Sequence, residues 1–227
     1  MSHDASVACD KAMCAALAAH GFPSRRLALI KPGAPYPSRA QVVVETPIVR
    51  YQFGARGSVD LASPVLVRFG HGDAAISVRV VAPQGAAAYQ QELKADVRQR
   101  RGEGAGLLTN SHVSVSAAAR RALLAGRADV RLIVVLTAIA SVHPIDILRF
   151  GTDFPGTSPG VPLRMAELAL DDRAAHMSEA DYVRFLLTLL DAEPDGYRPL
   201  IAGPARAAGS RVFQITFAAP SPLKLLG

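Results

Sequence analysis

Short stretches in the first part of the chain have the hydrophobic pattern of β-strands. In residues 75–82 apolar and polar side chains alternate, which is the period-2 pattern of a strand with one buried face. Runs rich in β-branched residues predict two further strands, at residues 41–46 and 64–69. The sequence Gly-His-Gly-Asp at residues 70–73 joins the last two strands and predicts a hairpin turn.

Other stretches carry the longer period, the capping residues or the Gly and Pro stops of helices. The predicted helices cover residues 10–20, 85–101, 116–125, 130–141 and 178–190. Two more strands are expected at residues 145–150 and 211–217. The glycine-rich stretch 102–106 should end the second helix and divide the chain into an N-terminal α/β subdomain, residues 1–106, and a C-terminal subdomain, residues 107–227. The pattern therefore predicts an α+β fold with a sheet-rich N-terminal half and a helix-rich C-terminal half.

Composition excludes several classes of protein. Half of the 227 residues are hydrophobic and 19% are charged, so the chain can bury a core and is not disordered as a whole. The longest apolar run, Leu132–Val142, is too short to span a bilayer, which takes about 20 residues. The first residues also lack the basic start and apolar run of a secretory signal peptide.

The net charge of +6 is concentrated in one region. Residues 94–131 contain eight basic and three acidic side chains, and such a cluster could contact phosphates or an anionic surface. Nucleic-acid modules usually add aromatic residues, and none occurs between Gln90 and Ala140. Solvated helix faces explain these charges better, so no nucleic-acid partner is expected.

One sequence matches a catalytic motif. Residues 156–160, Gly-Thr-Ser-Pro-Gly, fit the G-x-S-x-G pattern of a hydrolase nucleophile and follow a predicted strand. The oxyanion hole of that motif uses the backbone N–H after the nucleophile, but Pro159 follows Ser158 and has no N–H. A Pro- and Gly-rich loop is therefore the favoured interpretation of residues 151–162.

Neither the histidines nor the cysteines form a recognisable metal site. No two of the six histidines are two, three or four residues apart, so no metal and no cofactor are expected. Cys9 and Cys14 are the only cysteines, and their spacing fits neither a C-x-x-C redox motif nor a zinc site. Side chains five residues apart point away from each other on a regular helix, so a bridge requires one cysteine to precede the helix. One disulfide or two buried thiols both remain open on this basis.

Several stretches of the chain resemble an uncharacterised family of envelope proteins of high-GC Gram-positive bacteria. They include CDKAMCAALAAHGFP, VVVETPIVRYQFGAR, FGTDFPGTSPGVPLRMAEL and APSPLKLLG. In that family such a region follows a membrane anchor or signal. The resemblance implies an extracytoplasmic location, a disulfide between Cys9 and Cys14, and an envelope protein or cell-wall component as partner.

Residues 109–217 are also remotely similar to bacterial zinc DD-peptidase-like domains. The similarity rests on AGRADVR before an apolar helix and on HPIDILRFG after it. Ser158 and Arg164 keep the places of the family's S-x-H-x-x-G-R-A-x-D motif, but Gly160 replaces its histidine and Glu167 its aspartate. This resemblance implies a peptidase-like scaffold that has lost its metal ligands, since catalytic zinc needs three protein ligands and a bound water.

The favoured function is therefore a non-catalytic, exported domain that binds or positions a partner at the cell envelope. The main alternative is a hydrolase with a site around the loop at residues 150–162, and a basic cytoplasmic nucleic-acid binder is a third possibility. Loops of this length are often functional, and the charged and polar residues of a ligand site there would be Arg149, Asp153, Ser158, Arg164 and Glu167. Alternatively, the loop packs on the surface and Arg164 pairs with Glu167 on a short helix.

Overall fold

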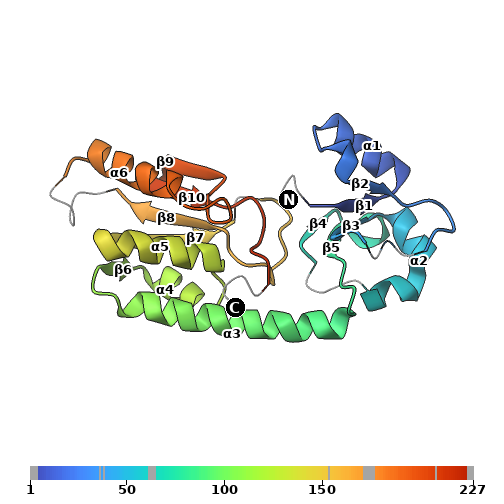
Figure 1. Cartoon of the computed structure of the whole chain (residues 1–227), viewed down its shortest axis with the longest axis horizontal. Helices are drawn as coiled ribbons and strands as arrows, with labels where there is room; N and C mark the ends of the chain where they lie inside the picture. The colour runs from blue at the N-terminus through green and yellow to red at the C-terminus, as the bar shows by residue number, and fades with distance from the viewer. Residues whose placement is uncertain are drawn as a thin grey trace. The chain divides into compact units, whose positions relative to one another are not determined.

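A computed structural model describes residues 5–35, 37, 39–60, 65–152, 154–170, 177–207 and 209–223. Helices and strands are mixed along the chain, which has the α+β fold predicted from the sequence (Figure 1). The chain forms two compact units: unit 1 is Met1–Lys94 with Phe154–Val161, and unit 2 is Ala95–Asp153 with Pro162–Gly227. Each unit has a five-stranded sheet, so the expected contrast between a sheet-rich and a helix-rich half is not found.

Unit 1 is built on a mixed sheet with the strand order β2-β1-β3-β5-β4. Its elements are β1 (Val7–Cys9), α1 (Lys11–Ala19), β2 (Leu27–Leu29), β3 (Val42–Glu45), α2 (Pro47–Asp60), β4 (Val67–Phe69) and β5 (Ile76–Val80). β1 runs parallel to both of its neighbours, β2 and β3, whereas β5 runs antiparallel to β3 and β4. From β1 the chain continues to β2 on one side of that strand and then crosses to β3 on the other side. The junction between β1 and β3 is therefore a topological switch point.

Both faces of the unit 1 sheet are buried at its central strands, β1 and β3. Val7 and Cys9 of β1 pack with Met13 of α1, whereas Ala8 packs on the other face with Val49 of α2. A strand that is covered on both faces has apolar residues at every position. Short strands such as β1 therefore lack the alternating pattern that reveals a half-buried strand.

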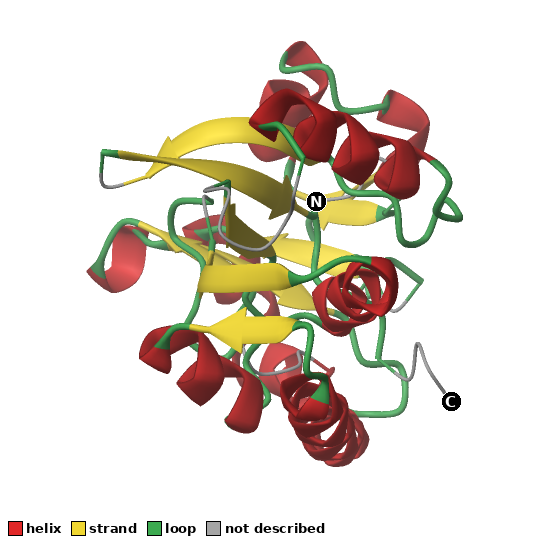
Figure 2. Cartoon of the chain, turned by 90° about the vertical axis from the view of Figure 1, so that its left-hand side faces the viewer, coloured by secondary structure: helices red, strands yellow, loops and turns green. Residues whose placement is uncertain are grey.

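Unit 2 contains a second mixed sheet with the order β6-β7-β8-β10-β9. The elements are α3 (Ala86–Thr109, from Ala95 onward), β6 (Val113–Val115), α4 (Ala117–Leu124), α5 (Val130–Val142), β7 (Ile145–Gly151), β8 (Met165–Ala169), α6 (Glu179–Asp191), β9 (Ile201–Ala207) and β10 (Ser210–Thr216). The main core joins Ile147, Leu168 and Phe213 of the sheet to Leu136 of α5 and Leu186 of α6. Figure 2 shows helices lying against strands.

Helix α3 continues through the glycine-rich stretch that was expected to end it. The helix runs from Ala86 to Thr109, so residues 102–106 lie inside it. An ideal Cβ at Gly104 would lie 2.9 Å from the carbonyl oxygen of Leu123, which is closer than real Cβ atoms approach. At Gly104 the glycine permits the close packing of α3 and α4, and the units divide between Lys94 and Ala95 inside the same helix.

No helix in the described part of the chain combines the length and the apolar character needed to cross a membrane.

Candidate functional site

The residues predicted to gather at one ligand site are divided between the two units. Arg149 lies on β7 and Glu167 on β8, and Arg164 immediately precedes β8 in unit 2. Ser158 belongs to unit 1. Asp153 lies outside the described residues.

Arg149 and Glu167 form a bidentate ion pair across two strands. They are directly opposite each other on β7 and β8, and Arg149 Nε donates to Glu167 Oε2 at 2.9 Å while Nη2 donates to Oε1. The Glu167 side chain is 7% exposed and that of Arg149 is 54% exposed. The expected pairing of Arg164 with Glu167 on a short helix is wrong, because Met165–Ala169 is a strand and Glu167 pairs with Arg149.

Arg164 is buried in unit 2 at 4% exposure. Its Nη1 donates to the carbonyl oxygen of Ala218 at 2.7 Å, and its own carbonyl accepts the backbone N–H of Phe217 at 2.9 Å. Burial lowers the pKa of Arg164 below its usual value, and the nearby charge of Asp129 opposes that shift. Arg164 therefore holds the chain that follows β10.

Asp129 and Arg131 hold the same segment from the start of α5. Asp129 is fully buried and caps the helix, and its two carboxylate oxygens each lie 3.1 Å from a guanidinium nitrogen of Arg131. Asp129 Oδ2 also accepts the backbone N–H of Ser221 at 2.8 Å, and Arg131 Nη2 donates to the carbonyl of Ala219. The Arg131 guanidinium carbon lies 4.4 Å from the centre of the Phe217 ring. We call Asp129, Arg131 and Arg164 the buried cluster; it anchors residues 217–221 largely through main-chain atoms.

A second buried ion pair connects α3 to the turn after α4. Arg100 Nε lies 2.8 Å from Asp96 Oδ2, and Arg100 Nη1 donates to the carbonyl oxygen of Gly126 at 2.5 Å. Burial raises the pKa of Asp96 above its usual value, while the positive charge of Arg100 counteracts that rise. The contacts of this pair are internal to unit 2 and position two helices.

Part of the loop that was expected to form a ligand site pairs with the sheet of unit 1. Thr157 forms a bridge with Val67 of β4, the N–H of Arg68 donates to Gly156 O at 2.8 Å, and the N–H of Ser158 donates to Leu66 O at 3.2 Å. An ideal Cβ at Gly156 would lie 2.4 Å from the carbonyl oxygen of Arg68, and its φ of +74° also favours glycine. Residues 156–158 therefore cover the edge of β4, which would otherwise present unpaired backbone groups.

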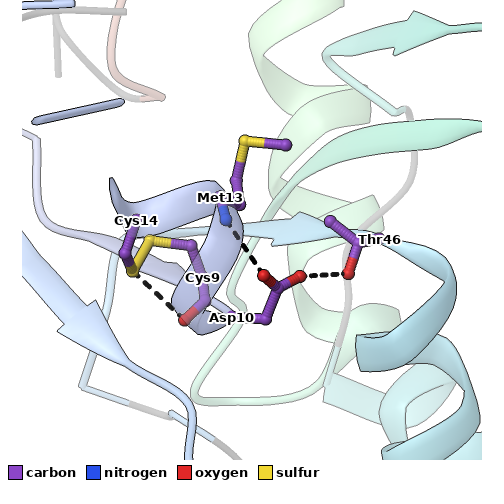
Figure 3. The surroundings of a disulfide bond; sticks show 5 residues. All are labelled: Cys9, Asp10, Met13, Cys14 and Thr46. Atoms are coloured by element: carbon purple, nitrogen blue, oxygen red, sulfur yellow. Dashed lines mark hydrogen bonds between the residues drawn. A yellow bond between two sulfur atoms is a disulfide. The ribbon is translucent and has the colours of Figure 1, made fainter. Parts of the chain in front are cut away.

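Two helix caps meet at the topological switch point of unit 1 (Figure 3). Asp10 follows β1 and caps α1, with its Oδ1 accepting the N–H of Met13 at 3.0 Å. Thr46 follows β3, and its Oγ1 donates to Asp10 Oδ2 at 2.5 Å and accepts the N–H of Val49 at 3.4 Å. Both Asp10 and Thr46 are buried. Ligands often bind at this edge of such a sheet, but here the chain's own caps bond to each other.

A disulfide joins Cys9 to Cys14 beside these caps. Cys9 is the last residue of β1 and Cys14 lies in α1, so one cysteine precedes the helix as the spacing requires. The Cα atoms are 5.4 Å apart, and Cys14 Sγ lies 3.2 Å from the carbonyl oxygen of Cys9. Cys9 is fully buried, whereas Cys14 is half-buried. Both cysteines of the chain are used in this bridge.

Sequence reasoning did not identify the buried cluster or the paired caps. Asp129 stands directly before a predicted helix and Asp10 is the first residue of another; Asp at the start of a helix is the usual N-cap and the signal that could have found them. Thr46 precedes Pro47, and a capping residue followed by Pro is a typical helix start, so this pair could have revealed α2.

Comparisons with protein-family models, curated proteins and solved structures found no match for this chain. Among the described residues, no group of three or more His, Cys, Asp or Glu side chains is arranged to hold a metal ion.

Proposed function

We propose that this chain is an extracytoplasmic domain that binds or positions a partner at the cell envelope and does not catalyse a reaction. The observation that carries the proposal is the disulfide between Cys9 and Cys14. Disulfides form and persist in oxidising compartments such as the cell surface, and they are rare where thiols are kept reduced. The sequence resemblance to envelope proteins supports the same location.

The contacts of the predicted site residues favour structural roles over catalytic ones. Arg149 and Glu167 bond to each other, and Arg164 holds the main chain at Ala218. The N–H of Ser158 is used in the pairing with Leu66, and Pro159 follows it without an N–H to stabilise an oxyanion. These contacts support structural roles for Arg149, Arg164 and Glu167.

Surface labelling of intact cells tests the location. The full gene product is produced in a high-GC Gram-positive host, and the cells are treated with a membrane-impermeant, amine-reactive biotin reagent before lysis. We expect the protein to be biotinylated in intact cells, while a cytosolic marker is labelled only after lysis. Labelling of this protein only after lysis would contradict the proposal.

Incubation with purified cell walls tests the absence of catalysis. We expect the protein to cosediment with walls, or with the envelope fraction, and to release no soluble peptide or sugar fragments. Release of such fragments at a rate that depends on protein concentration would show catalysis and contradict this part of the proposal.

A further inference from the structure

Five exposed arginines lie on two adjacent helices of unit 2 and in the turn that follows them. They are Arg98 and Arg101 on α3, Arg120 and Arg121 on α4, and Arg127 in the turn that follows. Arg98 and Arg101 are three residues apart and therefore share one face of α3. Asp96 and Arg100 of the same helix are buried. We call these five exposed residues the arginine surface.

Close packing between the two helices brings these arginines together. An ideal Cβ at Gly126 would lie 2.6 Å from the carbonyl oxygen of Val97, which is adjacent in sequence to Arg98. Arg101 Nε donates to the carbonyl oxygen of Ala125 at the end of α4, at 3.3 Å. Arg127 follows Gly126 directly, so Arg98, Arg101 and Arg127 lie at this contact, and Arg120 and Arg121 lie earlier on the same helix α4.

Little negative charge offsets the arginine surface. The acidic residues between 95 and 131 are Asp96, Glu103 and Asp129, and of these only Glu103 is exposed. Asp96 and Asp129 are already paired with Arg100 and Arg131 inside unit 2. Among the residues that the structure describes, no acidic side chain forms an ion pair with any member of the arginine surface.

An apolar side chain lies within this charged region. Leu124 is 51% exposed and lies three residues after Arg121 and four after Arg120, so the three share one face of α4. Helices that lie on anionic membranes combine basic residues with exposed apolar ones in this way. Surfaces that bind single-stranded nucleic acid instead use aromatic side chains to stack on the bases. Residues 90–140 contain no aromatic residue.

We propose that the arginine surface and Leu124 dock unit 2 on a bilayer that contains anionic phospholipids. The guanidinium groups would contact lipid phosphates, and Leu124 would enter the boundary between headgroups and acyl chains. The choice of a membrane as the anionic partner rests on the proposed envelope location, whereas the charge and the exposed leucine are observed independently of it.

Vesicle sedimentation tests the docking surface. Vesicles of phosphatidylglycerol and phosphatidylcholine are compared with vesicles of phosphatidylcholine alone. We expect the full chain to sediment with the anionic vesicles only, and to be released by salt because the attraction is electrostatic. The triple variant Arg98→Gln/Arg120→Gln/Arg121→Gln should lose affinity by about fivefold for each arginine removed.

A matched variant removes the same charge elsewhere. The triple variant Arg184→Gln/Arg198→Gln/Arg211→Gln replaces three arginines of unit 2 that already have acidic partners, so it should retain nearly all of the binding. Leu124→Ser should weaken binding without changing its dependence on salt. Circular dichroism and thermal unfolding establish that each variant is folded.

Several results would overturn the inference. These are no binding to anionic vesicles, equal binding to anionic and neutral vesicles, and an equal loss of affinity in the two triple variants. Displacement of the protein from vesicles by duplex DNA at a lower concentration than by soluble lipid headgroup would also overturn it. The cell-labelling experiment tests the envelope location and does not depend on these vesicle results. A labelled protein that ignores vesicles refutes the docking surface alone, and a vesicle-binding protein that is labelled only after lysis refutes the envelope location.

Discussion

Charged residues that are buried or half-buried in unit 2 bond to main-chain atoms as well as to charges of opposite sign. Arg100 reaches Gly126, Arg131 reaches Ala219 and Arg164 reaches Ala218. Removing one residue of such a set leaves a buried charge or carbonyl without its partner. The resulting loss of stability is greater than that caused by losing an exposed ion pair. The substitutions that matter most for stability should therefore be in these residues.

Arg164→Ala should lower the free energy of unfolding by about 3 kcal/mol, because it leaves the Ala218 carbonyl without its donor and removes a buried positive charge near Asp129. The matched substitution Arg184→Ala removes an exposed arginine and should cost at most about 0.5 kcal/mol. Urea unfolding of both variants measures the difference. A cost for Arg164→Ala as small as that of Arg184→Ala would contradict the structural role of the buried cluster.

Asp96 should make stability depend on pH. Burial raises its pKa in the folded protein above the ordinary value of 3.8, so the folded state binds the proton more tightly than the unfolded chain does. The contribution of Asp96 to stability is therefore greatest below pH 3.8 and falls as the pH rises through the folded-state pKa.

The substitution Asp96→Asn removes this titration. We expect the free energy of unfolding of the original protein, relative to that of the variant, to increase as the pH is lowered from 7 toward 4. Chemical denaturation across this range measures it. A relative stability that decreases over the same range would show that the pKa of Asp96 is lowered instead.

Elements with strong local signals were predicted well from the sequence. Ser116 and Ser178 cap helices at the expected positions, and the alternating residues of β5 form a strand that pairs with β4 as expected for a hairpin. β9 was missed because its sequence, IAGPARA, has little β-branched content and contains Pro204. Pairing with β10 along its whole length, rather than local preference, makes it a strand.

The pairing of residues 156–158 with the edge of β4 predicts the effect of a substitution at Gly156. Gly156→Ala should destabilise unit 1 by about 2 kcal/mol, since the new methyl group would meet the Arg68 carbonyl and the φ of +74° disfavours alanine. Gly196→Ala, where nothing lies within 4 Å of the added carbon, should change stability little.

Hydrogen exchange at the N–H of Arg68 is the sharpest measure of this effect, because that group donates to Gly156. We expect its exchange to be faster in Gly156→Ala and unchanged in Gly196→Ala. Equal exchange in both variants would show that residues 156–158 do not hold the edge of the sheet.

For the whole molecule, the class of fold was predictable but the arrangement of the candidate site was not. The order of helices and strands indicated an α+β protein. Residues 156–158 pair with Leu66, Val67 and Arg68, about 90 positions earlier in the chain, and no local pattern reveals such a partner. The residues around that loop were therefore grouped by their nearness in sequence, although the fold assigns them to different units.

The disulfide connects the fold to the proposed location. By loop length alone a bridge between residues so close in sequence stabilises the protein by about 2 kcal/mol. The double variant Cys9→Ser/Cys14→Ser should therefore still fold, with a loss of that order in thermal or urea unfolding. A loss of the native circular dichroism spectrum in this variant would show that unit 1 depends on the bridge far more than its length implies.

Trapping the thiols in living cells tests the extracytoplasmic location directly. Cells that produce the full gene product are quenched with acid, and free thiols are alkylated with a maleimide reagent large enough to shift the protein on a gel. We predict no shift at Cys9 or Cys14 without prior reduction, and a shift corresponding to two thiols after reduction. Two free thiols in the unreduced sample would place the protein in a reducing compartment and contradict the proposed function.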